Sequence, residues 1–362
     1  MSQGPGDSGL DLNRQDRASA VAYEWAQRTF ANRKGRAGFP ILGTGGFFAN
    51  LMDFPGTVIS MTSDGIGTKA ELAERTGIYR TLGFDLMAMV VDDLVAVGCE
   101  PVNVTNILDV DTVDPSVVDE LMHGLHEAAA VARVAVVGGE IAELGDRIGG
   151  WGDGMHFNWC ATAIGILPAG RPPLDGHLVA AGDAVVALRS DGFRSNGFSL
   201  VRRVMAATFG ADWHREPCEA STWGRVLLTP SRIYAPLVVD LAAEGVAVSG
   251  VVHVTGGGVP GNLARLLRPN GLGADLGALF PPHSFMREVM QRGGVPAEQA
   301  YRLWNMGNGM LLTMPPGQVG PCLAAAEARG YPARVAGTVT PDPAIVLHTE
   351  DGSVLAFPGG RR

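Results

Sequence analysis

An octapeptide at residues 62–69, Thr-Ser-Asp-Gly-Ile-Gly-Thr-Lys, holds side chains that suit chemistry on a phosphorylated molecule. It presents a carboxylate, Asp64, a hydroxyl, Thr68, and an ammonium, Lys69, within six positions. A carboxylate suits a hard cation such as Mg²⁺, whereas lysine and backbone N–H groups suit phosphate oxygens. The alternative is that these residues form a tight turn with solvated polar side chains, since a short motif match is only a hypothesis about function. The glycines of this turn are Gly65 and Gly67.

A second group of acidic residues lies on the apolar segment 81–97, which predicts a long helix. Asp85 and Asp92 are seven positions apart and share a face of that helix, and Asp93 lies about 100° round from Asp92. Charged side chains are rarely buried without a partner. This face therefore meets either solvent or a cation. Carboxylates that share a site repel one another, so a metal ion would be needed to hold them together.

Two glycine-rich segments extend this candidate site. Residues 138–140, Gly-Gly-Glu, follow a short apolar run at 134–137 that predicts a buried strand, and open α/β sheets bind ligands at the carboxyl ends of strands. Glu140 is therefore a candidate ligand; the alternative is a glutamate at a helix start, which the helix dipole favours. Residues 43–46 lack the ending of a Walker loop, yet flexible glycines let backbone N–H groups approach phosphates. The glycines of this loop are Gly43, Gly45 and Gly46.

Two polar loops in the second half suit a phosphorylated substrate. Residues 195–197, Ser-Asn-Gly, precede a predicted helix, where the alternative is an N-capping turn. Residues 253–261, His-Val-Thr-Gly-Gly-Gly-Val-Pro-Gly, lie between a predicted strand and a predicted helix. A helix N-terminus after a glycine turn is an anion-binding position. A histidine such as His253, taken alone, is more often a core histidine with satisfied hydrogen bonds than a catalytic base.

Residues 256–261 also match the pattern G-x-G-x-x-G of dinucleotide-binding folds, with Asp275 about 14 positions further on. Pro260 inside the turn, the short spacing to the acidic residue and the lack of an initial βαβ unit argue against that interpretation. No Ser/His/Asp or Cys/His arrangement follows from the spacing of residues. The pattern favours Mg²⁺ and nucleotide phosphate in the first half, with a phosphorylated substrate bound by loops of the second.

The composition restricts the class of protein. The chain has 362 residues, which predicts roughly two domains, and 46% apolar residues are enough for a large core. A formal charge of −9 leaves no basic footprint, so we expect no nucleic-acid partner. The four cysteines include no C-x-x-C pair, which argues against a zinc site and fits a reducing compartment. No apolar run approaches the roughly 18 residues that span a bilayer. We expect a soluble, cytoplasmic protein with no membrane partner.

Strands and helices alternate in both halves, which predicts an α/β or α+β architecture. The Pro/Gly-rich stretch that starts at Pro168 is the best boundary between the halves. The predicted strands are 57–61, 102–108, 134–137, 157–167, 184–188 and 246–254, and the predicted helices are 19–33, 81–97, 115–131, 198–209, 233–244 and 262–267, with a third strand–helix passage at 310–328. The predicted organisation is a disordered tail at 1–18, an N-terminal domain at 19–168, a linker at 169–182, a C-terminal domain at 183–350 and a tail at 351–362.

Several motifs, in collinear order from about residue 40 to about residue 345, carry a resemblance to a known family. They are Gly43-Thr44-Gly45-Gly46-Phe47, Asp64-Gly65-Ile66-Gly67-Thr68-Lys69, Gly83-Phe84-Asp85-Leu86-Met87-Ala88-Met89, Asp93-Leu94, Gly138-Gly139-Glu140, Ser195-Asn196-Gly197, Pro230-Ser231-Arg232-Ile233-Tyr234, His253-Val254-Thr255-Gly256-Gly257-Gly258 and Asn305-Met306-Gly307-Asn308-Gly309-Met310. The chain resembles the phosphoribosylformylglycinamidine cyclo-ligases, or aminoimidazole ribonucleotide synthetases, of purine biosynthesis. The first-half motifs are shared with selenophosphate synthetase, thiamine monophosphate kinase and a hydrogenase maturation factor.

The resemblance implies a two-domain fold whose N-terminal sheet pairs with that of a second subunit to form a barrel, giving a homodimer. It implies that ATP activates an amide oxygen of formylglycinamidine ribonucleotide as an iminophosphate, after which ring closure releases phosphate. Positioning of charged groups then matters more than a protein nucleophile. The implied metal ligands are Asp64, Asp93 and Glu140, with Asp92 as a further candidate. The implied nucleotide-binding residues are Gly43, Gly45, Gly46, Asp64, Gly65, Gly67, Thr68, Lys69, Asp85 and Glu140. The implied substrate-binding residues are Ser195, Asn196, Thr255, Gly256, Gly257 and Gly258, and the implied catalytic residues are Lys69, Asn196 and His253.

The chain departs from the family pattern at several positions. The family's Asn-Asp pair is Asp92-Asp93 here, and the His of its Pro-His-Ser-Asn-Gly motif is Arg194. Family acids are replaced at Asn106 and Asn158, so gain of Asp92 predicts a relocated metal ligand. Three interpretations remain. The chain is a divergent cyclo-ligase that keeps the reaction, a paralogue that uses the same Mg²⁺-ATP site on another phosphorylated substrate, or a non-catalytic nucleotide-binding protein.

Overall fold

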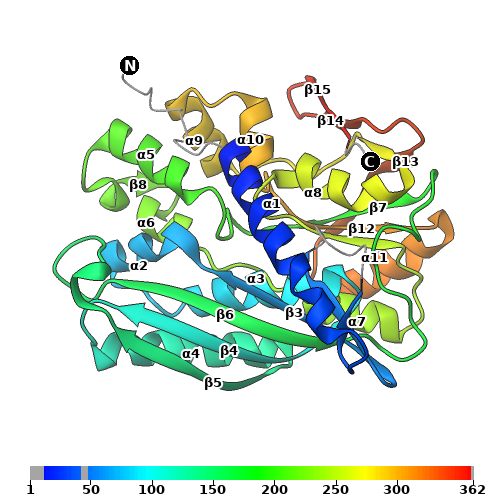
Figure 1. The fold of residues 1–362 in the computed structure, drawn as a ribbon. Coiled ribbons are helices and arrows are strands. Elements are labelled where there is room, and N and C mark those ends of the chain that lie inside the picture. The colour runs from blue at the N-terminus through cyan, green and yellow to red at the C-terminus, as the bar shows by residue number, and fades with distance from the viewer. Residues whose placement is uncertain (1–11, 42–47, 360–362) are drawn as a thin grey trace.

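The computed structural model describes residues 12–41 and 48–359, and it contains two open β-sheets, one in each half of the chain (Figure 1). The first sheet has the order β1-β2-β3-β6-β4-β5, and the second has the order β10-β12-β7-β13-β11-β14-β15. A short hairpin, β8-β9, lies apart from both. The mixed α/β architecture in two halves is as expected from the alternation of strands and helices.

The first sheet is mostly antiparallel. Strand β6 pairs antiparallel with β3 and β4, and β4 pairs parallel with β5 through the crossover helix α4. The strands are β1 (Phe39–Pro40), β2 (Asn50–Phe54), β3 (Thr57–Gly65), β4 (Glu100–Val110), β5 (Ala135–Glu143) and β6 (Phe157–Ile166). The helices are α1 (Leu12–Arg28), η1 (Phe30–Arg33), η2 (Gly67–Lys69), α2 (Ala70–Thr76), α3 (Leu82–Ala96), α4 (Pro115–Ala132) and η3 (Gly145–Arg147).

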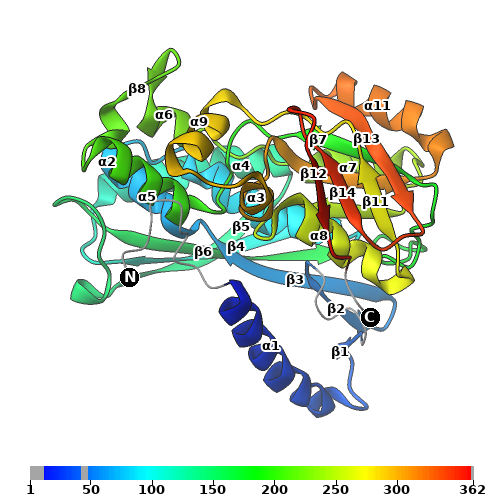
Figure 2. The ribbon, with the colours of Figure 1, turned by 90° about the horizontal axis from the view of Figure 1, so that it is seen from above.

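Helix α3 is the centre of the molecule. It contacts β3, β6 and α4 of the first half and α7 and β10 of the second half. In Figure 2 it lies near the middle of the molecule. Almost every residue of α3 is buried, including its aspartates. A helix covered on all sides is apolar all round, which is why this segment is so apolar in the sequence. Its carboxylates are consequently enclosed by protein.

One face of the first sheet is covered by α3 and α4, and the other face is open in this chain. Burial alternates along β4, because successive side chains point to opposite faces. Leu108 points toward the helices and is fully buried, whereas Ile107 points away and is 51% exposed. Met61 on β3 and Ile166 on β6 are exposed on the same open face.

The second sheet is enclosed on both faces at its centre. All residues of β10 and β12 are buried, and β7 is buried except at its last residue, which explains their near-continuous apolar sequences. Its strands are β7 (Ala184–Arg189), β10 (Gly250–His253), β11 (Gly273–Leu276), β12 (Asn308–Met314), β13 (Ala333–Thr340), β14 (Ile345–His348) and β15 (Val354–Phe357). The hairpin strands are β8 (Pro217–Cys218) and β9 (Ser221–Thr222). The helices are α5 (Phe198–Phe209), η4 (Trp213–Arg215), α6 (Trp223–Leu227), α7 (Ala235–Ala243), α8 (Gly258–Leu267), η5 (Arg268–Asn270), α9 (Ser284–Gly293), α10 (Ala297–Leu303), η6 (Pro316–Gln318) and α11 (Val319–Ala328).

The helix expected at 115–131 is confirmed, and its start has the expected cap. The Asp114 side chain accepts a hydrogen bond from the Ser116 N–H at 2.9 Å, and Pro115 occupies the first helical position. Within the described ranges, no helix is both long enough and apolar enough to cross a membrane.

Three expectations differ from the structure. Helix α1 begins at Leu12 rather than at residue 19, so the part of the expected disordered tail from residue 12 onward is helical, and residues 1–11 lie outside the described part of the chain. Strand β15 lies in the expected tail at 351–362, where it pairs antiparallel with β14. Strand β5 is an exposed edge strand of nine residues, not a short buried one, because only β4 flanks it.

Candidate active site

Asp64 and Asp93 form an acidic pair between β3 and α3. Asp64 lies near the end of β3 on the face that α3 covers, and Thr62 on the same face donates a hydrogen bond to Asp93 Oδ2 at 3.4 Å. Burial raises the pKa of Asp93 to about 7. Burial also raises the pKa of Asp64 to about 6, against a hydrogen bond from the Gly65 N–H at 2.7 Å, and the nearby Asp93 charge raises it further. Both carboxylates therefore ionise with difficulty unless a cation approaches.

This pair fits Mg²⁺ only when other ligands complete the shell. Among residues 12–41 and 48–359, no group of three or more His, Cys, Asp or Glu side chains is placed to hold a metal ion. Mg²⁺ is commonly bound by one or two carboxylates together with substrate phosphates and waters. The donor set of two carboxylates therefore fits a Mg²⁺ ion that arrives with a phosphorylated ligand.

His253, the last residue of β10, contacts this pair from the second half. Its Nδ1 lies 2.7 Å from Asp93 Oδ1, and its Nε2 lies 2.9 Å from Nη2 of Arg194. Burial lowers the pKa of His253 to about 3, and the charge of Arg194 lowers it further, so the imidazole is neutral. A guanidinium only donates hydrogen bonds. Nε2 therefore accepts from Arg194, and Nδ1–H donates to Asp93.

Asp92 faces away from Asp64. Its Oδ1 accepts hydrogen bonds from the N–H groups of Tyr234 and Ala235 at the start of α7, each at 2.9 Å. Its Oδ2 lies 2.8 Å from Nη2 of Arg194. Both side chains are buried, and the Arg194 guanidinium also lies over the Tyr234 ring. Both oxygens of Asp92 therefore already have partners within the protein, and a metal-binding role for Asp92 stays a prediction.

Lys69 and Asp85 form a second buried ion pair between the halves. The Lys69 Nζ lies 2.7 Å from Asp85 Oδ2 and donates to the Thr229 carbonyl at 2.9 Å. Asp85 also accepts from the Ser231 N–H at 3.1 Å. Burial lowers the pKa of Lys69 and raises that of Asp85. In this arrangement Lys69 and Asp85 hold a loop of the second half, which differs from the expected phosphate contact.

Three loops lie side by side near the acidic pair. The first contains Gly67 and the exposed Thr68, whose hydroxyl lies 3.4 Å from Ser199 Oγ. A Cβ atom on Gly67 would lie 3.9 Å from the Ser195 carbonyl oxygen, and one on Gly256 would lie 3.7 Å from Asn196 Oδ1. The loops 64–68, 194–197 and 255–258 thus lie next to one another.

The third of these loops opens helix α8. Gly257 and Gly258 have φ of 100° and 62°, and a Cβ on Gly258 would lie 1.8 Å from the Tyr301 carbonyl oxygen, so only glycine fits there. Asn262 Nδ2 donates to the carbonyl oxygens of Thr255, Gly256 and Gly258, at 2.9 Å for the last. These hydrogen bonds hold the turn that opens α8 in place.

Glu140 is not brought to this pair within one chain. It pairs in register with Ile107, whose side chain lies on the open face of the sheet, whereas Asp64 lies on the helix-covered face. Strands β6 and β4 separate Glu140 from Asp64, which corresponds to about 14 Å at the usual strand spacing. The expected phosphate loop with Gly43, Gly45 and Gly46 lies outside the described residues.

The sequence analysis missed the contact between Arg194 and Asp92. Each was noted only as a departure from the family pattern, and each was considered alone. Because these two departures from the family pattern carry opposite charges, the sequence could have indicated that they form an ion pair. Arg194 was not among the candidate site residues, although it links His253 to Asp92.

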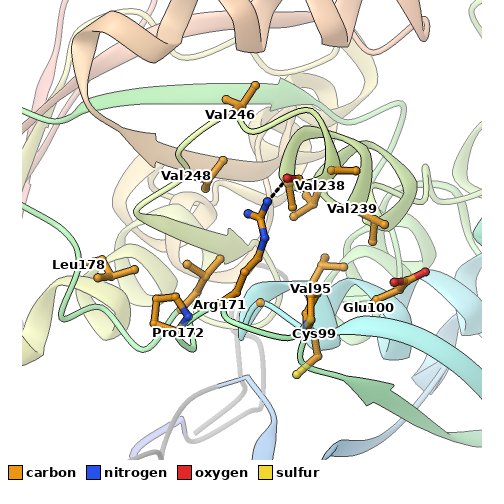
Figure 3. Close-up of a pocket in the computed structure, with 15 residues that line it drawn as sticks. Val95, Cys99, Glu100, Arg171, Pro172, Leu178, Val238, Val239, Val246 and Val248 are labelled. Atoms are coloured by element: carbon orange, nitrogen blue, oxygen red, sulfur yellow. Dashed lines mark hydrogen bonds between the residues drawn. The ribbon is translucent and has the colours of Figure 1, made fainter. Parts of the chain in front are cut away.

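A cavity of about 230 Å³ lies elsewhere, at the joint between the halves (Figure 3). Apolar side chains such as Val95, Leu178 and Val239 line it, and Arg171 crosses it to donate a hydrogen bond to the Ala242 carbonyl. None of the candidate site residues lines this cavity, so it plays no part in the site described above.

Comparison with known proteins places both halves of the chain. Residues 49–167 match the N-terminal domain, and residues 180–350 the C-terminal domain, of AIR synthase related protein. A phosphoribosylformylglycinamidine cyclo-ligase of Thermococcus kodakarensis is 37% identical over 308 residues, covering 85% of this chain and 87% of that protein. One of Sorangium cellulosum is 40% identical, covering 83% and 86% respectively.

Solved structures share the fold at low sequence identity. AaThiL complexed with AMPPCP and TMP matches with a TM-score of 0.59 at 16% identity, covering 86% of this chain and 89% of that one. The hydrogenase maturation protein HypE in complex with ATP matches with a TM-score of 0.59 at 17% identity, covering 84% and 85%. These two structures therefore have the same fold as this chain.

Proposed function

Because the chain belongs to the AIR synthase related family, we propose that it is a phosphoribosylformylglycinamidine cyclo-ligase, which uses ATP to close the imidazole ring of aminoimidazole ribonucleotide. The observation that carries this proposal is the meeting of loops 64–68, 194–197 and 255–258 beside the carboxylates of Asp64 and Asp93. One site can thus hold a triphosphate next to a ribonucleotide.

In the proposed reaction, the substrate's amide oxygen attacks the γ-phosphorus of ATP, forming an iminophosphate and ADP. The neighbouring amidine nitrogen then attacks the activated carbon, and the C–O bond breaks as inorganic phosphate leaves. Such chemistry depends on positioning and on neutralising charge, with no nucleophile from the protein. The described site agrees with this requirement, because it offers carboxylates, backbone N–H groups and an amide but no activated nucleophile.

We propose that Asp64 and Asp93 hold Mg²⁺ together with the triphosphate, and the raised pKa values of both carboxyls support this. The bound ion would neutralise phosphate charge. Asn196 and the N-terminus of α8 would bind the ribonucleotide. His253 would orient Asp93 rather than transfer a proton, since both of its ring nitrogens are engaged. Lys69 would hold the two halves in place through Asp85.

We also propose that two copies of the chain pair through the open face of the first sheet. Met61, Ile107 and Ile166 lie on that face with 50%, 51% and 41% exposure, which is unusual for large apolar side chains unless a partner covers them. Glu140 lies on the same face and would then point toward the second copy. A cytoplasmic location is proposed as well, because the cysteines at 99, 160, 218 and 322 form no disulfide.

The test is phosphate release by the purified protein with ATP, Mg²⁺ and formylglycinamidine ribonucleotide, with each component omitted in turn. We expect phosphate only in the complete mixture, and little in an Asn196→Ala variant that keeps its thermal midpoint. A second function, a paralogue acting on another phosphorylated substrate, is favoured by Arg194, which changes the loop that carries Asn196. Binding of ATP without turnover in the complete mixture would favour that alternative.

A further inference from the structure

The two departures from the family pattern that introduce a charge, Asp92 and Arg194, are in contact with each other. They are 102 positions apart in the sequence, yet Arg194 Nη2 lies 2.8 Å from Asp92 Oδ2, and the side chains are 2% and 0% exposed. A buried charge whose partner is removed is strongly unfavourable. Each of these residues is therefore tolerated because the other is present.

The backbone at Arg194 supports a specific role for its side chain. Arg194 has φ of 61°, a left-handed conformation that is uncommon for a residue with a long side chain. Histidine, which the family pattern has at this position, is one of the residues enriched in that region. An arginine at such a position is explained by what its guanidinium contacts, namely Asp92, His253 and the Tyr234 ring.

Hydrogen bonds link Asp92 to Asp93 through Arg194 and His253, and the donor of each bond can be assigned. The N–H groups of Tyr234 and Ala235 donate to Asp92, and Arg194 donates both to Asp92 and to His253 Nε2. Because Nε2 is an acceptor, the hydrogen of the neutral ring sits on Nδ1, which donates to Asp93 Oδ1 at 2.7 Å. Asp93 Oδ1 is thereby fixed, and Oδ2 accepts a long hydrogen bond of 3.4 Å from the Thr62 hydroxyl.

We propose that Asp92 and Arg194 are positioning residues that hold His253 as the Nδ1–H tautomer and so orient Asp93 to share a cation with Asp64. The part that concerns the cation rests on the proposed function. Groups that orient a metal-binding side chain typically change metal affinity about 10- to 100-fold when they are removed. Asp92 and Arg194 depend on each other, so both must be replaced together if the orientation of Asp93 is to be preserved.

The test compares Asp92→Asn, Arg194→His and the double variant Asp92→Asn/Arg194→His with the unmodified protein. The main readout is the Mg²⁺ concentration that gives half-maximal binding of the methylene ATP analogue AMPPCP. We expect each single variant to raise it about tenfold or more. The double variant should return to within about threefold of the unmodified protein, because neither side chain is then left as an unpaired buried charge.

The structure offers a matched control in a second ion pair between the halves. Arg133 also has a left-handed backbone, with φ of 60°, and pairs with Asp240 of α7 at 2.6 Å. This pair reaches neither His253 nor Asp93. Asp240→Asn should therefore leave the Mg²⁺ dependence of AMPPCP binding unchanged, even where it lowers the thermal midpoint.

A second readout is independent of nucleotide. The ¹⁵N spectrum of the His253 ring in the Mg²⁺-free protein should show a protonated Nδ1 and an unprotonated Nε2. A protonated Nε2, or single variants that change only the thermal midpoint and leave the Mg²⁺ dependence intact, would overturn the inference. If the unmodified protein binds AMPPCP with no dependence on Mg²⁺, the proposed function fails instead. The ring spectrum then decides separately whether Arg194 sets the tautomer.

Discussion

Replacing Asp93 by asparagine should make the Mg²⁺-free protein more stable at pH 8 while removing its binding of Mg²⁺ and nucleotide. Burial raises the pKa of Asp93 from 3.8 to about 7. The folded protein therefore holds a proton on Asp93 in a range of pH where the unfolded chain has lost it. A raised carboxyl pKa lowers the free energy of unfolding as pH rises from about 4 to about 7, and the full penalty is present above that range.

The magnitude follows from the size of that change in pKa. A difference from 3.8 to about 7 corresponds to about 4 kcal/mol at 1.36 kcal/mol per unit. Asparagine keeps an acceptor for His253 Nδ1–H and places a donor near Thr62, so both contacts of Asp93 survive the change. We expect Asp93→Asn to gain up to about 4 kcal/mol at pH 8, a smaller amount at pH 6, and almost nothing near pH 4.

The assay is urea denaturation of both proteins, without Mg²⁺, at pH 5, 6, 7 and 8. Asp92→Asn is the matched control on the neighbouring residue and has the opposite expected sign. It leaves Arg194 without its buried partner, so it should destabilise the protein by about 3 kcal/mol or less, because its amide retains some of the hydrogen bonds. If Asp93→Asn is less stable than the unmodified protein at pH 8, the ionised Asp93 is stabilised by its neighbours. The acidic pair would then have no uncompensated charge for an external cation to neutralise.

Three further predictions concern the interface between the two halves, the open face of the first sheet and the loop 255–258. Lys69→Met should lower the free energy of unfolding by about 3–5 kcal/mol in urea denaturation, because Asp85 is left as an unpaired buried carboxylate; a loss below about 1 kcal/mol would contradict this. Ile107→Glu should turn the proposed dimer into monomers in sedimentation experiments, whereas Val354→Glu, at a similarly exposed position on β15, should not; equal behaviour of the two would contradict the proposed interface. Gly258→Ala should lower the thermal midpoint and weaken substrate binding, since its Cβ would lie 1.8 Å from a carbonyl oxygen; unchanged binding would exclude this turn from the site.

The sequence predicted the central elements of the fold well. The helix expected at 198–209 has those bounds as α5, and the strand expected at 184–188 is β7, one residue longer. These elements have strong apolar patterns and clear boundaries, such as the glycine at Gly197 and the Pro/Gly-rich stretch before β7. The predicted burial of an element was wrong where its neighbours in the fold, rather than its own sequence, decide how exposed it is. Strand β5 is apolar in sequence, yet its residues are mostly exposed because it forms a sheet edge.

The site was predictable as a set of loops but not as a set of contacts. The residues that carry the resemblance did identify loops that meet in space. The roles of individual acidic residues on α3 could not be derived, because Asp85, Asp92 and Asp93 all point into protein and differ only in what the second half places opposite them. Asp85 meets Lys69, Asp92 meets Arg194, and Asp93 meets a neutral histidine. Helical periodicity predicts the direction in which a side chain points but not the residue that it contacts.

This difference between partners explains how one buried helix can carry three carboxylates. Asp85 and Asp92 each have a cation within 2.8 Å, so their charges are compensated inside the protein and tie the two halves together. Asp93 accepts a hydrogen bond from the neutral ring of His253. The charges of Arg265 and Arg194 lower the pKa of Asp93, but burial outweighs them and raises it to about 7. A buried carboxylate whose pKa is raised in this way gains free energy when an external cation binds. On this helix, Asp85 and Asp92 thus tie the two halves together, and Asp93 is the carboxylate that is proposed to bind an ion.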